Sequence, residues 1–200
     1  MSKKTKKEKL AKYDKMLNKY LKKRDCVKIY RTVRDGEADI YGIISGISDT
    51  FLQISENHEF KFNGEVIIRQ DHYESISCSK YEKIIKKILL AENELSENKP
   101  IKTKLDLSSW DSIFTDLKKQ DIHVIIECED LKEYTFTIGA IVGLTKKSVE
   151  VHNYDASGKL DKKSTIVKYK DITIVRFNDR YSTTFRKYLK QSKSSSKKSS

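Results

Sequence analysis

The feature of this sequence that most constrains its fold is an internal repeat. Residues 21–29 (LKKRDCVKI) match residues 117–125 (LKKQDIHVI) at an offset of 96, and residues 41–47 (YGIISGI) match residues 138–144 (IGAIVGL) at an offset of 97. A third match follows near the end of each copy. Ordered matches with a slowly growing offset predict two copies of one structural unit, with the additional residues in loops.

Each unit is expected to open with a helix. Thr5 with Glu8, and Ser108 with Asp111, form capping-box patterns before apolar stripes at helical spacing. Trp110 lies beside the second of these stripes. We expect both stripes to pack onto the strands that follow rather than to bind a partner.

A second helix is expected to close each unit. Ser79 with Glu82 forms a capping box before an apolar face that includes Tyr81, and Tyr181 begins the corresponding face of the second unit. These faces are expected to lie against the strands or against one another.

Short β-branched and aromatic runs predict five strands in each unit. Gly42 and Gly46, like Gly139 and Gly143, lie inside the second strand, where a missing side chain permits the bend that closes a small barrel. The sequence therefore predicts a mainly β fold with flanking helices (α+β), made of two tandem five-stranded antiparallel barrels of the Sm-like or SH3-like type. The expected strands are 26–33, 38–47, 50–56, 64–70 and 73–77, then 122–129, 134–144, 147–153, 164–169 and 172–177.

This pattern divides the chain into four parts. Residues 1–95 contain a basic helix, the first barrel and its closing helix, and 96–107 form a linker. Residues 108–190 contain the second helix, barrel and closing helix, and 191–200 form a disordered Ser/Lys tail.

The net charge of +12 is concentrated at the ends of the chain. Residues 1–24 carry eleven Lys or Arg and two acids, a net +9, and residues 186–200 carry six and none, a net +6, which leaves −3 for residues 25–185. The N-terminus has no signal-peptide pattern, and no apolar run approaches the roughly 18 residues of a membrane span. A cytoplasmic protein with three reduced cysteines is expected.

Two resemblances bear on this architecture. Gly42-Ile43-Ile44, and Ile68 to Asp71 leading to Ile76-Ser77, resemble the two short motifs of Sm-like proteins. That resemblance implies small barrels that bind RNA, usually as rings. The chain departs from the family at RNA-contacting positions, with Arg69-Gln70 where the family has Arg-Gly, and Ser48 and Leu52 where it has Asp and commonly Asn.

A longer resemblance covers most of the chain. Bacterial proteins with this two-barrel layout are similar to residues 41–54, 62–64 and 67–69 in the first half, and to 136–139, 155–158, 169–173 and 180–181 in the second. This resemblance implies the architecture but no activity.

No motif supports catalysis, a metal site or a cofactor, so a non-enzyme is expected. Asp71, His72 and Glu74 form the densest polar cluster, but alternation along a strand turns Asp71 away from the other two. We interpret the cluster as a solvated turn.

The leading functional hypothesis is nucleic-acid association, most simply with RNA. Lysines at the ends neutralise phosphates, and tyrosines such as Tyr30, Tyr41 or Tyr154 are candidates for base stacking. The alternative is a protein-interaction module that uses barrel grooves or strand edges. The candidate nucleic-acid-binding residues are Lys3, Lys4, Lys6, Lys7, Arg69, Lys168, Lys190, Lys193, Lys197 and Lys198.

Overall fold

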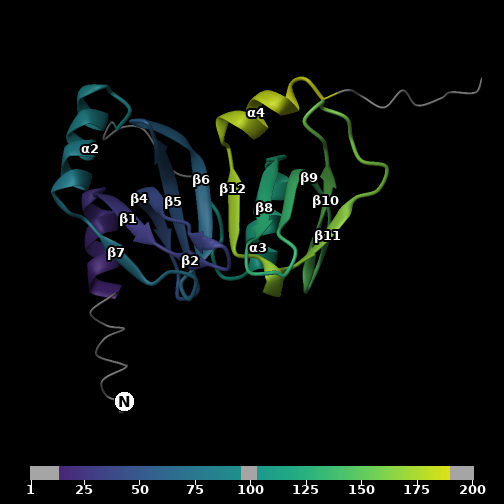
Figure 1. The fold of residues 1–200 in the computed structure, drawn as a ribbon, viewed down its shortest axis with the longest axis horizontal. Coiled ribbons are helices and arrows are strands. Elements are labelled where there is room, and N and C mark those ends of the chain that lie inside the picture. Colours follow the sequence, from purple (N-terminus) through teal and green to yellow (C-terminus); the bar gives the residue numbers. More distant parts are fainter. Residues whose placement is uncertain (1–13, 96–102, 190–200) are drawn as a thin grey trace, which may run out of the picture.

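The computed structural model describes residues 14–95 and 103–189, which form one large antiparallel sheet with helices packed on it (Figure 1). A first helix is described over residues 14–23. In the first half there follow β1 (Cys26–Tyr30), β2 (Thr32–Val33), β3 (Gly36–Glu37), β4 (Ile40–Ile47), β5 (Phe51–His58), β6 (Lys61–Arg69), β7 (Ser75–Ser77) and α2 (Lys80–Ala91). The second half contains α3 (Trp110–Lys119), β8 (Val124–Cys128), β9 (Thr135–Thr145), β10 (Ser148–Asn153), β11 (Thr165–Lys168), a 3-10 turn (Tyr169–Asp171), β12 (Ile174–Phe177) and α4 (Arg180–Arg186).

The sheet has the strand order β11-β10-β9-β8-β12-β6-β5-β4-β1-β7, and β2 and β3 form a separate hairpin. The two halves of the chain meet where β12 pairs with β6, with Ile174 opposite Ile68 and Phe177 opposite Glu65. Within residues 14–95 and 103–189, β7 and β11 end the order with one neighbour each, so the sheet formed by these residues is open.

The expectation of two separate five-stranded barrels is wrong. Each expected strand range overlaps an observed strand, and helices flank both halves, but the pairing differs. The outer edge of β6 has peptide groups that require partners, and β12 of the other half supplies them. The sheet therefore continues from one half into the other instead of closing within each half.

The expected capping boxes have different outcomes. Ser79 caps α2 and Glu82 completes the box, as predicted. For α3 the prediction was wrong by one residue, because the side chain of Ser109 accepts the hydrogen bond from the Ser112 N–H. The Thr5 and Glu8 pattern lies outside the described residues.

The closing helices bury less than expected. On α2, Leu89 is buried, whereas Tyr81 and Ile84 are 64% and 52% exposed. On α4, Tyr181 is half-exposed, and Tyr188 lies beyond the helix with 74% of its surface exposed.

The hydrophobic cores of the two halves share residues across the β6–β12 ladder. Phe51 and Ile67 of the first half belong to the core formed around α3, and Ile174 of the second half belongs to the core of the first. The ring of Phe51 meets that of Trp110 edge-on at 4.7 Å. Packing across the junction therefore stabilises both halves together.

The strand pairings of the two halves correspond with a nearly constant shift. Leu52 lies opposite Ile68 in the first half, and Val149 lies opposite Val167 in the second, a shift of 97 for the first residue and 99 for its partner. The same two shifts relate Ile29↔Ile76 to Ile126↔Val175. A shift of 97 at both residues relates Ile44↔Ile54 to Ile141↔Val151.

Of the four glycines that were expected to bend the second strand of each unit, two are required by close approach of a neighbouring strand. A Cβ at Gly42 would lie closer than 3.0 Å to the carbonyl oxygen of Ser55, and one at Gly139 would do the same with His152. At Gly46 and Gly143 the nearest atoms belong to side chains, those of Leu107 and Glu150 among them. These glycines serve strand approach within an open sheet rather than closure of a barrel.

None of the described helices has the length and apolar character needed to cross a bilayer.

Gly139→Ala is expected to lower the free energy of unfolding by about 2 kcal/mol or more, because backbone must move to admit the methyl group. The matched control is Gly143→Ala, whose nearest obstacle is the carboxylate end of Glu150. Denaturant unfolding measures both, and equal losses would contradict the steric argument.

Stability is expected to fall as pH drops from 7.5 to 5.5. His123 is 9% exposed, and burial, with a smaller contribution from Arg186, lowers the pKa of its imidazole, while Asp121 opposes this shift. The unfolded chain binds a proton near pH 6.5 that the folded chain binds only at lower pH, so protons favour unfolding. Urea unfolding of the wild type and His123→Phe at both pH values tests this, and an unchanged pH dependence in the variant would refute the assignment.

Candidate nucleic-acid interface

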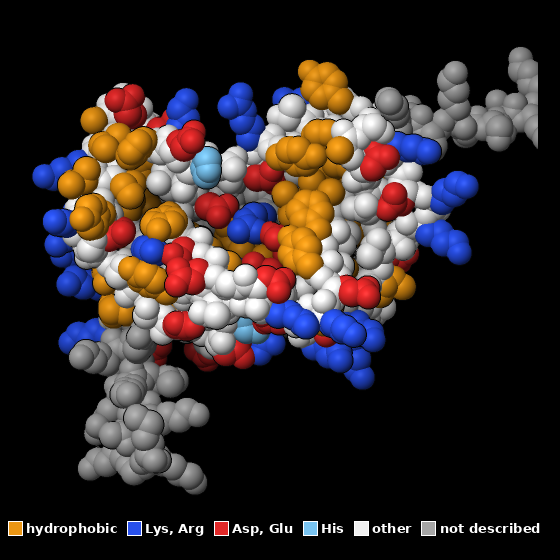
Figure 2. Space-filling view, viewed as in Figure 1, with side chains coloured by type: hydrophobic (Ala, Val, Ile, Leu, Met, Phe, Trp, Pro, Cys, Tyr) orange, Lys and Arg blue, Asp and Glu red, His pale blue; other side chains and the backbone are white. Residues whose placement is uncertain are grey.

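Four lysines surround a pocket at one end of the sheet. Lys146 and Lys147 come from the β9–β10 turn, Lys168 ends β11, and Lys170 lies in the 3-10 turn that follows. Figure 2 shows Lys and Arg side chains gathered at the lower right, below β10 and β11. The pocket, of about 570 Å³, is completed by Ser148, Ile166 and Tyr169. We call it the lysine-rimmed pocket.

Local hydrogen bonds bring these lysines together. The hydroxyl of Thr145 accepts from the N–H groups of Lys147 and Ser148, at 3.2 and 3.0 Å, which fixes the β9–β10 turn. The N–H of Tyr169 donates to the carbonyl of Lys147 at 2.9 Å. This bond holds the segment that carries Lys168 and Lys170 against the turn.

The floor of the pocket is apolar and aromatic. Ile166 is 67% exposed, although it lies in a strand. The ring of Tyr169 stacks on Phe114 at 5.7 Å, and Phe114 stacks on Trp110 at 5.5 Å. Burial and the nearby carboxylate of Asp111 raise the pKa of Tyr169 to about 12, so its phenol is neutral at physiological pH.

Positive charge at this pocket is largely uncompensated. None of the residues lining it is acidic. Lys170 lies 4.0 Å from Asp171, and within the described residues no carboxylate lies within 4.0 Å of the other three lysines. An anionic ligand is therefore the partner that the charge favours.

Of the ten candidate residues taken from the sequence, Lys168 lies in this pocket. Arg69 lies elsewhere and makes two bonds to Asp71, at 2.9 and 2.5 Å. The terminal candidates Lys3, Lys4, Lys6, Lys7, Lys190, Lys193, Lys197 and Lys198 lie outside the described residues.

The candidate stacking tyrosines differ in accessibility. Tyr154 is 3% exposed and stacks on Phe185, so its assignment as a base-stacking residue was wrong. Tyr41 is 38% exposed, and the ammonium group of Lys28 lies over its ring and over that of Tyr30.

Four residues of the pocket were not expected from the sequence: Lys146, Lys147, Tyr169 and Lys170. The available signal was the pair of short basic segments, KK just before β10 and KYK beginning at the last residue of β11, which antiparallel pairing of these strands brings to one end.

A second pocket opens between the β5–β6 hairpin and α4. It has a volume of about 680 Å³ and mixes aromatic, acidic and basic side chains, including Glu59, Lys61, Arg180 and Tyr181. Its mixed charge favours a phosphate chain less than the lysine-rimmed pocket does.

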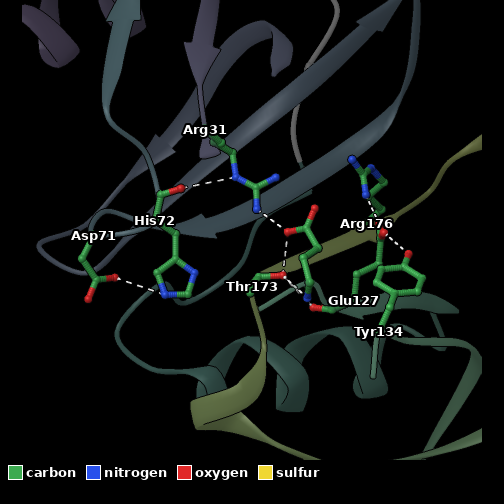
Figure 3. A network of polar contacts seen from close by, with 8 residues as sticks. Arg31, Asp71, His72, Glu127, Tyr134, Thr173 and Arg176 are labelled. Atoms are coloured by element: carbon green, nitrogen blue, oxygen red, sulfur yellow. Dashed lines mark hydrogen bonds and ion pairs between the residues drawn. The ribbon is translucent and has the colours of Figure 1, made fainter. Parts of the chain in front are cut away.

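A network of polar side chains joins the two halves of the chain (Figure 3). Arg31, whose side chain is 1% exposed, donates from Nη2 to Glu129 at 2.5 Å and from Nε to the His72 carbonyl at 3.3 Å. The hydroxyl of Thr173 lies 2.6 Å from the same carboxylate of Glu129. This network links the first half to β8 and β12 of the second.

A second part of the network centres on Arg176 of β12. Its guanidinium pairs with Glu127, which also accepts from the hydroxyl of Tyr134, and lies 3.5 Å from Glu56. Burial raises the pKa of Glu56, and Arg176 opposes this shift. The ion pairs bridge β5, β12 and β8.

The expected solvated turn lies at the margin of this network. The side chain of Asp71 is 62% exposed, and Nε2 of His72 lies 3.8 Å from it. Among the described residues, no group of three or more His, Cys, Asp or Glu side chains is placed to hold a metal ion.

Comparison with known proteins gives no relative: no family model, no curated protein and no solved structure matches this chain.

Arg31→Met is expected to lower the free energy of unfolding by about 3 kcal/mol or more, because it leaves the Glu129 carboxylate at the junction without its cationic partner. The double variant Arg31→Met/Glu129→Met should recover much of that loss, since it removes both charges. Denaturant unfolding provides the measurement. A double variant with the summed loss of the two single variants would show that the pair does not act as a unit.

Proposed function

We propose that this protein is a non-catalytic binding protein that associates with nucleic acid, most simply single-stranded RNA, through the lysine-rimmed pocket and the Lys-rich ends of the chain. The observation that carries the proposal is the convergence of four lysines around Ile166 and Tyr169. Lysines neutralise phosphates without reading sequence, and an apolar floor of this kind accepts the face of a base.

The charge distribution supports this surface over the rest of the described chain. Residues 25–185 are net acidic, yet the lining of the lysine-rimmed pocket has four cations and no acid. A polyanion is attracted to this end of the sheet and repelled by much of the remainder. Binding by such a surface is salt-dependent and weakly selective for sequence.

Charge reversal at the pocket tests the proposal. The variant Lys146→Glu/Lys147→Glu/Lys168→Glu/Lys170→Glu is expected to weaken binding of a short fluorescent RNA by at least about tenfold. Each lost phosphate contact should flatten the slope of log K against log salt by about 0.7 for a single strand. Fluorescence anisotropy across a salt series measures both quantities.

The matched control reverses four exposed lysines elsewhere, in Lys83→Glu/Lys87→Glu/Lys132→Glu/Lys159→Glu, and changes the net charge equally. Its effect on affinity should be small, and its salt slope should stay near that of the wild type. If both quadruple variants lose the same affinity, RNA responds to net charge alone and the pocket is not the binding site.

A further inference from the structure

The two halves of this protein are joined by strands that do not correspond to one another. β6 is the fourth large strand of the first half, and β12 is the last strand of the second. The shift of 99 residues relates β6 to β11 and β7 to β12. The two free edges of the sheet, β11 and β7, are therefore the counterparts of the two strands that form the junction.

We infer that β11 of one molecule pairs antiparallel with β7 of a second copy of this chain, as β6 pairs with β12 within the molecule. In the β6–β12 ladder, Ile67 lies opposite Val175 and Val66 lies opposite Arg176. Applying this register to the corresponding strands β11 and β7 predicts which residues of the two copies face each other. Ile166 would lie opposite Ile76, and Thr165 opposite Ser77. The partner is thus a second copy, bound at a strand edge.

The exposure of Ile166 supports this pairing. Its counterpart Ile67 is fully buried in the core around α3, where it packs with Val175. Ile166 is instead 67% exposed, on a strand that has no outer neighbour among the described residues. A large β-branched side chain at the free edge is the residue that a second copy would cover.

The backbone of β11 is oriented for the same pairing. In the first half, the N–H of Gln70 donates to the carbonyl of Thr50, just before β5, and in the second, the N–H of Tyr169 donates to the carbonyl of Lys147, just before β10. Peptide groups alternate in direction along a strand. The backbone N–H and C=O groups of Ile166 therefore point away from β10, toward the unpaired edge of β11, as those of Ile67 point toward β12.

The lysines of the pocket are compatible with this pairing. The shifts of 97 and 99 residues relate Lys146, Lys147, Lys168 and Lys170 to Asp49, Thr50, Arg69 and Asp71, in that order. At the existing β6–β12 junction, Asp49, Thr50 and Asp71 are exposed, and the side chain of Arg69 is 31% exposed. Pairing would cover Ile166, so a base and a second copy would compete for this side chain, while the lysine positions would stay at the rim, where phosphates can reach them. Like charge at the rim opposes association at low ionic strength, so about 0.3 M salt is the condition that favours it.

Because the two edges of one molecule differ, this association is heterologous and each added copy presents a fresh edge. Dimers should therefore be accompanied by larger species as the concentration rises.

The first test is sedimentation velocity of the nuclease-treated full chain over a concentration series at about 0.3 M salt. The wild type is expected to shift from monomer to dimer and larger species, and Ile166→Asp should weaken association at least about tenfold. Val142→Asp is the matched control, because Val142 is 44% exposed but lies on β9, inside the sheet. It should associate as the wild type does.

The second test examines the register by disulfide formation. In a Cys78→Ser background, the pair Ser77→Cys/Thr165→Cys should cross-link copies under mild oxidation. The counterparts of these two residues, Arg176 and Val66, lie directly opposite each other in the β6–β12 ladder. The pair Ser75→Cys/Thr165→Cys, which is out of register by two residues, should cross-link much less. Non-reducing electrophoresis separates the products.

Three outcomes would overturn the inference. A wild type that stays monomeric at every concentration would show that the edges remain unpaired. Equal association by Ile166→Asp and the wild type would place the contact elsewhere, as would equal cross-linking by the two cysteine pairs. None of these depends on RNA, so the failure of this inference and the failure of RNA binding are distinguishable.

Discussion

The ladder between β6 and β12 is the interaction on which the rest of the structure depends. It converts two sets of strands into one sheet and brings residues far apart in the sequence into shared cores. Trp110 reaches Phe51 and Arg31 reaches Glu129 because the ladder fixes the two halves side by side. Burial of apolar side chains favours this association, and the ion pairs Arg31–Glu129 and Arg176–Glu56 connect the two halves.

Joining the halves through unlike strands has a direct consequence for the surface. A symmetric junction would use the same strand from each half and leave two like edges. Here the junction uses β6 and β12, so the free edges β11 and β7 are unlike. The lysine-rimmed pocket lies at one of these edges, and so both the proposed RNA contact and the inferred pairing depend on how the sheet ends.

Local features of the fold were predictable from the sequence, and long-range pairing was not. The capping box of Ser79 and the positions of the strands depend on neighbouring residues, and the sequence displays them. β6 pairs with β5 on one edge, and whether its other edge pairs within its own half or with β12 depends on contacts between residues far apart in the sequence. No local pattern records that choice.

The errors at single residues have the same origin. The sequence match at an offset of 96 aligns Asp25 with Asp121, but the ladders place Val27 and Val124 in equivalent positions, opposite Gly42 and Gly139. Tyr154 was expected at the surface, yet Phe185 of α4 covers it. The first error arises because a short sequence match can be out of register with the strand pairing by one residue. The second arises because alternation identifies the face of a strand but not what packs on that face.

The placement of charge at the β11 edge separates two explanations of its lysines. Strand edges that are protected against pairing carry charge within the strand, where it would be buried by a neighbour. At β11 the position that a neighbour would bury holds Ile166, and three of the four lysines lie in the flanking turns. Such an arrangement leaves the edge competent to pair and keeps the ammonium groups in solvent, where phosphates can reach them. The lysines therefore fit a role in binding an anion better than a role in blocking the edge.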